Sequence, residues 1–161
     1  MGIRQNSLMA TPSENLEKLG LTLPDAPAPV ASYVNCVATG NLLHISGGLP
    51  FDSEGNLITG KVPGDVSVED AQNAAKQVIL NRLAVIKGEL GSLERVTKVV
   101  SISGFVSSGP DFYDHPKVIN GASDFLLEIF GDAGKHSRIA LGVSALPLNV
   151  CVEISMIVEF E

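Results

Sequence analysis

Segments with the periodicity of strands alternate with segments of helical periodicity along this chain, and this order limits the possible folds more than any other feature. Residues 67–90 and 115–130 each carry an apolar stripe at helical spacing. In the first segment the stripe consists of Ala75, Ile79, Leu83, Ile86 and Leu90. In the second it consists of Val118, Ala122, Phe125, Leu126 and Ile129. Strands interleaved with such helices predict an α+β fold, with one sheet and two helices packed on one face.

Local signals set the ends of both predicted helices. Ser67 followed by Asp70 resembles a capping box with Asp in place of the usual Glu, and Gly91 favours termination. Pro116 suits the first turn of the second helix, which Gly131 ends. The polar face of the first helix is expected to consist of Asp70, Asn73, Gln77 and Asn81.

Five segments are predicted as strands, which gives the order β-β-α-β-α-β-β. The first two form a hairpin, because the turn residues Thr39, Gly40 and Asn41 separate them. The last two are joined by residues 147–149. The segments are YVNCVA, NLLHIS, RVTKVVSISGFVSS, RIALGVSAL and VCVEISMIVEF.

The last strand has two different faces. One is apolar and consists of Val152, Ile154, Met156, Val158 and Phe160. The other is mixed and consists of Cys151, Glu153, Ser155, Ile157 and Glu159. Because no further helix remains to cover a half-apolar sheet face, we expect it to be buried against another subunit.

The chain is expected to hold one domain over residues 19–161, preceded by a flexible segment over residues 1–18. Residues 21–33 are rich in proline and are predicted to be extended. Residues 51–65 are predicted to form a long loop.

Composition excludes some classes of function. The net charge of −7 does not suit a surface that tracks phosphates, so no nucleic acid is expected as a partner. The apolar runs are too short to cross a membrane, and the N-terminus lacks a secretory h-region. We therefore expect a cytoplasmic protein that acts on small molecules.

No cofactor or metal is expected. Residues 55–62 resemble the P-loop motif, but Val62 occupies the position of the Mg²⁺-binding hydroxyl. The segment is therefore predicted to be a turn-rich loop. Ser46, Gly47 and Gly48 end the second strand and could expose N–H groups to an anion, but an ordinary loop is the favoured interpretation. The cysteines Cys36 and Cys151 are predicted to be buried free thiols. The histidines His44, His115 and His136 lack metal-ligand spacing.

Arg138 and Glu153 are the sharpest candidates for chemistry. Arg presents a planar fork that binds a carboxylate at two points, and Glu can accept a proton or orient a water. A structural ion pair, or two edge residues reaching solvent, is the alternative. If the last two strands pair about Leu148, the two residues are offset by about five positions, roughly 16 Å. If the two strands instead flank a third strand, the offset along the strand axis remains. The offset predicts no salt bridge within the chain, so the two charges are either unrelated or meet across a subunit boundary.

Arg138 and Glu153, together with three other segments of the chain, also carry a family resemblance. Tyr33 lies in SYVN, ISGGLP spans 45–50 and NGAS spans 120–123. The segment SRIALGVSALPLNVCVEI then shows an Arg, fourteen residues with a Leu-Pro pair among them, and a Glu. From Leu19 to Phe160 the chain resembles the YjgF/YER057c/UK114 family, or Rid family, of reactive intermediate deaminases, in a longer branch of that family.

The resemblance implies a chorismate-mutase-like fold that assembles as a homotrimer with ligand clefts between subunits. It implies that Arg138 holds a substrate carboxylate and that Glu153 positions the attacking water. Tyr33, Ser46, Gly47 and Asn120 match cleft residues, and the Ala140 carbonyl could hold water. The implied reaction is hydrolysis of 2-imino or enamino acids to 2-keto acids and ammonia, without a cofactor.

The chain also departs from the family pattern. Ala140 replaces a common Cys, Gly48 replaces a common Gln, and KHSR replaces Pro-Ala-Arg, which puts His136 near the predicted site. Two alternatives therefore stay open beside the deaminase: a non-catalytic trimer that binds small carboxylates or acts like a chaperone, and RNA cleavage or translation inhibition, which the acidic composition disfavours.

Overall fold

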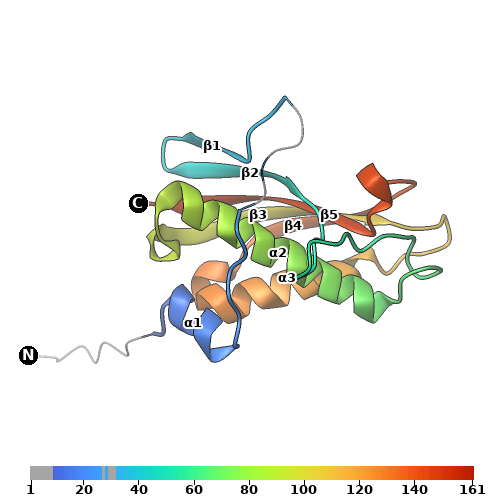
Figure 1. The fold of residues 1–161 in the computed structure, drawn as a ribbon, viewed down its shortest axis with the longest axis horizontal. Helices are drawn as coiled ribbons and strands as arrows, with labels where there is room; N and C mark the ends of the chain where they lie inside the picture. Colours follow the sequence, from blue (N-terminus) through green and yellow to red (C-terminus); the bar gives the residue numbers. More distant parts are fainter. Residues whose placement is uncertain (1–8, 27, 29–31) are drawn as a thin grey trace, which may run out of the picture.

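One mixed sheet with helices on one of its faces makes up residues 9–26, 28 and 32–161, the part of the chain that the computed structural model describes (Figure 1). The strands are β1 (Cys36–Thr39), β2 (Leu42–Gly48), β3 (Val96–Ser107), β4 (Ser137–Val143) and β5 (Val152–Phe160). The longer helices are α1 (Pro12–Lys18), α2 (Val68–Leu90) and α3 (His115–Phe130). Short 3-10 turns are η1 (Leu93–Arg95), η2 (Gly131–Gly134) and η3 (Pro147–Asn149). The predicted order β-β-α-β-α-β-β is confirmed, with α1 as an addition.

The strands lie side by side in the order β1-β2-β5-β3-β4. β3 and β4 run parallel and are joined by α3, whereas the other neighbouring strands pair antiparallel. The last two strands therefore do not pair as a hairpin but flank β3, the second of the two arrangements considered above. Because α3 crosses over and returns the chain parallel to β3, β4 occupies one edge of β3 and β5 occupies the other.

The predicted local signals act where expected. Ser67 is the N-cap of α2 and its Oγ accepts a hydrogen bond from the Asp70 N–H at 3.0 Å. Gly91 ends the helix with a φ of 84°, a left-handed conformation that glycine adopts without strain. Gly40, with a φ of 58°, turns the hairpin between β1 and β2.

The apolar stripe of α2 is buried as predicted, but its polar face is shorter than predicted. Asn81 is only 4% exposed, because the segment that follows β2 covers it. Its side-chain amide donates hydrogen bonds to the carbonyl oxygens of Leu49 and Phe51, at 3.3 and 3.2 Å. Asn81 thus fixes the chain where it leaves the sheet.

The helix α1 lies inside the segment 1–18, for which the sequence predicts flexibility; residues 1–8 lie outside the described residues. Thr11 and Glu14 form a capping box at its start. The Asn15 side chain donates to the Ile129 carbonyl oxygen at 2.9 Å, and the Ser13 N–H donates to Glu94 at 3.1 Å. Hydrogen bonds from Ser13 and Ser92 lower the pKa of Glu94 to about 2. Distant contacts thus hold a helix too short to be stable alone.

The proline-rich segment predicted to be extended lies partly outside the described residues, at 27 and 29–31. Residues 51–65 form the predicted loop, tied to the sheet by isolated bridges from Thr59 to Val150 and from Val62 to Ser108. The P-loop-like segment at 55–62 is therefore part of this loop and does not connect a strand directly to a helix, as a P-loop does.

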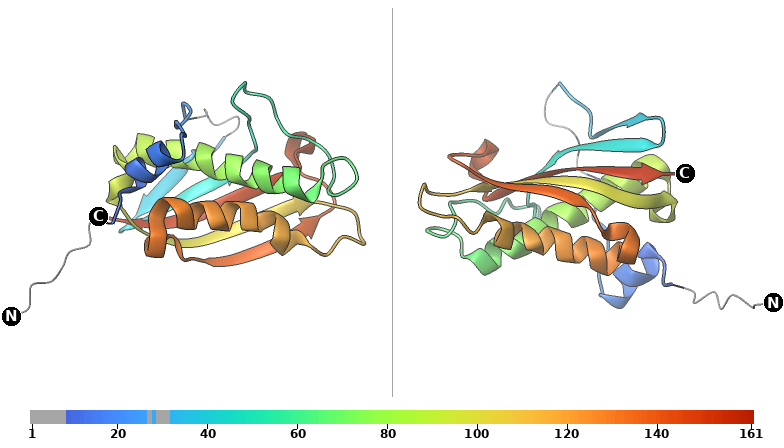
Figure 2. Two further views of the ribbon diagram at one scale, coloured as in Figure 1. Left: turned by 90° about the horizontal axis from the view of Figure 1, so that it is seen from below. Right: turned by 180° about the vertical axis from the view of Figure 1, so that it is seen from behind.

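The helices cover one face of the sheet and leave the other uncovered within the described chain (Figure 2). On β5, Val152, Ile154 and Val158 are fully buried beneath the helices, so the two predicted faces of this strand are confirmed. On the uncovered face, Ile139 and Leu141 of β4 are 51% and 48% exposed. The subunit predicted to cover this face stays an expectation.

Two glycines bring α3 close to its neighbours. A side chain at Gly104 of β3 would meet the carbons of Ile119 at 2.6 to 2.9 Å, so the bare backbone there makes room for this residue of α3. A side chain at Gly121 would overlap the backbone oxygen of Gln72 in α2. The position of α3 over the sheet therefore depends on these two glycines.

We expect Gly121→Ala to lower the free energy of unfolding by about 3 kcal/mol, because the backbone of α2 cannot move aside as a flexible side chain can. Gly88→Ala is the matched control, since Gly88 lies in the exposed part of α2 with open space around it. It should raise stability by about 0.5–1 kcal/mol. Urea unfolding followed by circular dichroism measures both; equal stability of the two variants would contradict the close contact.

Candidate functional site

Arg138 lies on the helix-covered side of the edge strand β4. In the sheet it stands opposite Ile102, which is buried beneath the helices. Its guanidinium Nη1 donates to Asn120 Oδ1 at 2.8 Å and to Ser123 Oγ at 3.1 Å, and both partners belong to α3. The structure therefore brings together two of the predicted site residues, Arg138 and Asn120.

A hollow of about 490 Å³ surrounds this arginine, and we call it the arginine pocket. It is lined by Asn120, Ser123, Leu127, Lys135, His136 and Arg138. The Lys135 ammonium is paired with Asp132 at 2.7 Å on the exposed rim. The Nε and Nη2 groups of Arg138 have no hydrogen-bond partner in the described residues. The Nε and Nη2 groups of Arg138 can therefore donate hydrogen bonds to an anionic ligand.

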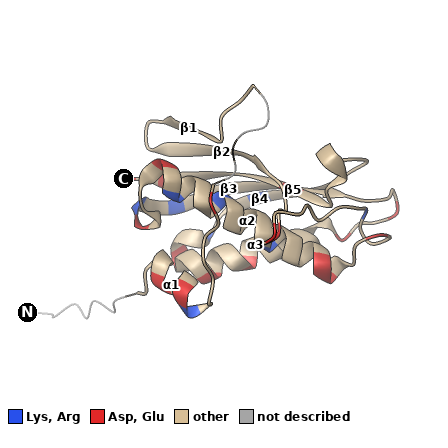
Figure 3. Ribbon diagram, viewed as in Figure 1, with Lys and Arg blue, Asp and Glu red and all other residues tan. Residues whose placement is uncertain are grey.

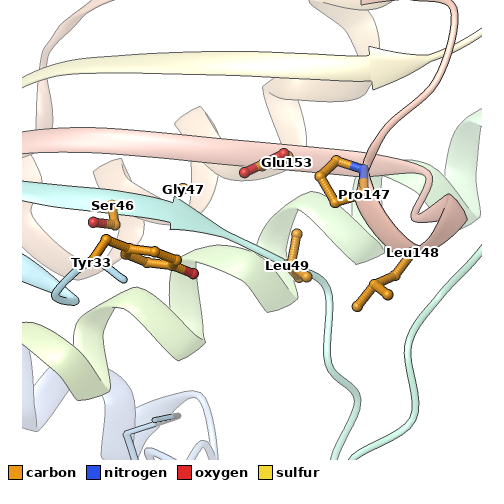
Figure 4. Close-up of a pocket in the computed structure, with 7 residues that line it drawn as sticks. All are labelled: Tyr33, Ser46, Gly47, Leu49, Pro147, Leu148 and Glu153. Atoms are coloured by element: carbon orange, nitrogen blue, oxygen red, sulfur yellow. The ribbon is translucent and has the colours of Figure 1, made fainter. Parts of the chain in front are cut away.

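Four other predicted residues gather in a second hollow of about 550 Å³, the glutamate pocket (Figure 4). It is lined by Tyr33, Ser46, Gly47, Leu49, Pro147, Leu148 and Glu153. The Ser46 hydroxyl donates to the Val34 carbonyl oxygen at 2.7 Å, which ties β2 to the segment that carries Tyr33. A side chain at position 47 would overlap a Glu153 carboxylate oxygen, so glycine keeps that carboxylate accessible.

The two pockets lie on opposite faces of the sheet. Glu153 stands between the buried Val152 and Ile154 on β5, and side chains alternate along a strand, so Glu153 points to the uncovered face. Arg138 instead contacts α3 on the covered face. The arginine pocket and the glutamate pocket therefore do not form one site within a single chain.

The register also corrects the size of the predicted offset between the two charges. Arg138 pairs with Ile102 and Glu153 with Phe105, both on β3. Three residues correspond to about 10 Å along the strand, which is shorter than the offset of roughly 16 Å expected for a hairpin. β3 lies between the two strands, and within the described residues Arg138 and Glu153 form no ion pair. The prediction that they do not meet inside the chain is confirmed.

Burial raises the pKa of Glu153, and the nearby charge of Arg82 lowers it in part. Arg82 is a buried residue of α2 that the sequence analysis did not single out. It is 4% exposed, its Nη1 donates to the Ser46 carbonyl oxygen at 3.4 Å, and burial lowers its pKa. Its Nε has no hydrogen-bond partner among the described atoms. A charged residue on the buried face of a predicted helix was the signal that could have pointed to it.

Ala140 is on β4 opposite Gly104 and packs against the hydrophobic core. It shares the covered side of the strand with Arg138, two residues away. The sequence analysis assigned no role to Ser123, which contacts Arg138 directly, and singled out His136 only because it lies two residues before Arg138. The fold explains both, because the loop after α3 turns back and places His136 beside Ser123, with the ring Nε2 2.9 Å from Oγ.

Neither cysteine lines the arginine pocket or the glutamate pocket. Cys151 is a fully buried free thiol, as predicted, and burial raises its pKa to about 11. Cys36 is only half-buried. In the described chain, no three histidine, cysteine or carboxylate side chains gather closely enough to hold a metal ion.

These observations define the class of protein: a small α+β domain with one sheet, helices on one face, and on each face a pocket that holds one candidate charged residue. The model of the YjgF/chorismate-mutase-like endoribonuclease family matches residues 13–160. The chain belongs to this family, as the resemblance implied, and its fold is the chorismate-mutase-like fold.

Individual relatives agree with this assignment. Protein TCP17 of Trypanosoma cruzi is 41% identical over 146 residues, which cover 90% of this chain and 91% of the relative. The 2-iminobutanoate/2-iminopropanoate deaminase of Dermatophagoides farinae is 28% identical over 88% of this chain and 95% of its own. The crystal structure of the protein Atu1372 from Agrobacterium tumefaciens is 42% identical, covers 94% of both chains and superposes with a TM-score of 0.86.

None of the helices in the described residues has both the length and the apolar character needed to cross a bilayer.

We expect Glu153→Gln to stabilise the protein at neutral pH. Because the folded-state pKa of Glu153 is raised, the native state binds this proton more tightly than the unfolded state does, and ionising the carboxyl costs stability as pH rises through that pKa. The variant lacks this cost. Its melting temperature should exceed that of the wild type at pH 7, and the difference should shrink as pH falls toward the ordinary value of 4.5.

Thermal unfolding measured across this pH range checks the sign. Glu159→Gln is the control, since Glu159 lies on the same strand nearer its end. A destabilised Glu153→Gln variant at neutral pH would contradict the assignment of Glu153 as a carboxylate held in an unfavourable environment.

Proposed function

We propose that this protein hydrolyses 2-imino and enamino acids to 2-keto acids and ammonia, at clefts that two subunits of a homotrimer form together. The observation that carries the proposal is the division of the site between the arginine pocket and the glutamate pocket, on opposite faces of one sheet. The name of the Dermatophagoides farinae relative supports the same chemistry.

Arg138 is proposed to bind the substrate carboxylate. Every 2-imino acid carries this group beside the reacting carbon, so one arginine can orient substrates with different side chains. Asn120 holds the arginine at 2.8 Å and adds an amide to the wall of the same pocket. Binding through two parallel hydrogen bonds would fix both the position and the plane of the substrate.

Glu153 is proposed to handle the proton of the attacking water. The water oxygen bonds to the carbon of the protonated imine while the carboxylate accepts a proton from that water, which gives a carbinolamine. The carboxyl group returns this proton to the nitrogen, the carbon–nitrogen bond breaks and ammonia leaves, as the hydroxyl oxygen forms the keto carbonyl and releases its own proton to the carboxylate. A carboxylate whose pKa is raised by burial is a better base than an ordinary Glu, because it binds the proton more tightly. An iminium carbon is already electrophilic, so the proposal needs no cofactor.

A second copy of the chain is proposed to complete each cleft. On the uncovered sheet face, Leu141 pairs with Phe105, which in turn pairs with Glu153, so apolar side chains adjoin the glutamate pocket. At the pocket mouth Leu148 is 65% exposed and has a φ of 55°, an uncommon conformation for this residue. Cover by a neighbouring subunit would bury both groups and could bring its arginine pocket to this edge.

Arg138→Ala is expected to lower kcat/KM for freshly generated 2-aminoacrylate by about a hundredfold or more, because an arginine–carboxylate contact at two points is lost. Arg95→Ala is the matched control: Arg95 contacts the carbonyl oxygens of Leu90 and Glu161, outside both pockets. A coupled assay of 2-keto acid release measures both variants. Unchanged turnover in folded Arg138→Ala protein would refute the proposed role.

Leu141→Asp is expected to convert the trimer to monomers, because it puts a charge in the proposed interface. Leu19→Asp is the control, since Leu19 is 44% exposed next to α1 in the helix layer. Light scattering after size exclusion gives the mass in solution. A trimer of Leu141→Asp, or a monomeric wild type, would contradict the proposed assembly.

Binding of 2-keto acids without catalysis is the second candidate function, because the Ala140 position lacks the thiol that is common in the family. A panel of imino acids hydrolysed at the buffer rate, together with measurable 2-keto acid binding, would favour it. RNA cleavage gains little support: the net charge is −7, and Figure 3 shows acidic residues spread over the helices and connecting loops.

A further inference from the structure

We propose that Ser123 and His136 are positioning residues for Arg138, and that they hold its guanidinium in the orientation that binds a substrate carboxylate through two parallel hydrogen bonds. The inference rests on the proposed role of Arg138 as the carboxylate anchor. It adds two residues that the family resemblance did not assign and gives a reason for the histidine two positions before the arginine.

The contacts of Arg138 use one nitrogen and leave the opposite edge open. Nη1 carries two hydrogens, and its two acceptors are Asn120 Oδ1 at 2.8 Å and Ser123 Oγ at 3.1 Å. Asn120 and Ser123 are three residues apart on α3 and so share one face of the helix. The Nε hydrogen and one Nη2 hydrogen lie side by side on the free edge, with the spacing of two carboxylate oxygens.

His136 fixes the direction of the hydrogen bond on the other side of Ser123. Its Nδ1 lies 2.6 Å from the Gly134 carbonyl oxygen, which can only accept, so Nδ1 carries the hydrogen. In the neutral ring Nε2 is then an acceptor, and it lies 2.9 Å from Ser123 Oγ. The serine hydroxyl donates to Nε2 and keeps a lone pair for Arg138. Each group thus donates to the next: Arg138 donates to Ser123, Ser123 donates to His136, and His136 donates to the backbone carbonyl oxygen of Gly134.

This arrangement explains why a flexible side chain can act as a fixed anchor. An arginine loses rotamer freedom when it binds a ligand, and holding it in place beforehand removes part of that cost. The nearby Lys135 cannot take this role, because its ammonium is paired with Asp132 on the exposed rim. Among the described residues His136 forms a hydrogen bond with Ser123 and none with Arg138, so its effect on the arginine must pass through Ser123.

Titration calorimetry with pyruvate, the smallest stable 2-keto acid, tests the inference apart from turnover. Ser123→Ala should raise Kd by about tenfold, the size of one lost hydrogen bond to a charged group. His136→Leu should raise it by about threefold, and His136→Gln should recover most of the affinity, because the glutamine amide can offer an acceptor near the position of Nε2. The double variant Ser123→Ala/His136→Leu should match Ser123→Ala alone.

A second serine–histidine pair in this chain provides the matched controls. Ser108 Oγ lies 3.0 Å from His115 Nε2, in a separate hollow that Arg138 does not line. Ser108→Ala and His115→Gln break a hydrogen bond of the same kind and should leave Kd for pyruvate within about twofold of the wild type. Larger effects in these controls would show that the affinity loss reports general destabilisation, which would overturn the inference.

Three other results would also overturn it. These are wild-type affinity in Ser123→Ala, additive losses in the double variant, and a further loss when Ser123→Ala is added to Arg138→Ala. Failure of the proposed function looks different: absent hydrolysis, with the affinity pattern intact, would remove the deaminase reaction and leave the positioning role. Unchanged pyruvate binding in Arg138→Ala would remove both.

Discussion

The close docking of α3 on the sheet and on α2 is the contact on which the rest of the site depends. Gly104 makes room for Ile119, and Gly121 brings α3 against the backbone of α2 at Gln72. Because α3 is held at this distance, Asn120, which lies between Ile119 and Gly121 in the chain, reaches the arginine of the neighbouring edge strand. Apolar packing and two glycines thus determine where a polar contact can form. The position of α3 in turn determines the position of the Arg138 guanidinium.

The second constraint is that a sheet separates its two faces. β3 stands between the strands that carry Arg138 and Glu153, and the two side chains leave the sheet in opposite directions. No rotamer change within one chain can bring them together through a packed sheet. If both act on one substrate, the second group must come from another copy. The exposed Ile139 and Leu141 on the uncovered face give such a copy an apolar surface on which to pack.

Much of the fold was predictable because its signals are local. The turn at Gly40, the caps of α2 and the alternation along β5 each depend on residues a few positions apart. The order of the strands was not, because a chain that reverses near Leu148 can form a hairpin or pass to the far side of β3. The face of Arg138 was also ambiguous, since β4 carries apolar residues on both of its faces: Ile139 and Leu141 on one, Ala140 on the other.

The site was predictable only in part, for the same reason. Arg138 and Glu153 stood out as charges in apolar strands, and the resemblance supplied Tyr33, Ser46, Gly47 and Asn120. Ser123 and His136 come together only when α3 and the turn after it are folded, so no spacing in the sequence marks the pair. Arg82 was marked in the sequence as a charge on the apolar face of a predicted helix, but only the folded structure shows that it donates to the Ser46 carbonyl oxygen beside the glutamate pocket.

Subunit complementation tests the central claim, a site shared between copies of the chain, most directly. Arg138→Ala and Glu153→Ala proteins, each inactive alone, would be unfolded together, refolded as a mixture and assayed for release of 2-keto acid. A shared site predicts that about a quarter of the wild-type activity returns in an equal mixture, because a cleft then receives its arginine and its glutamate from intact sources by chance. A mixture that stays inactive, while both variants form mixed oligomers, would contradict the account.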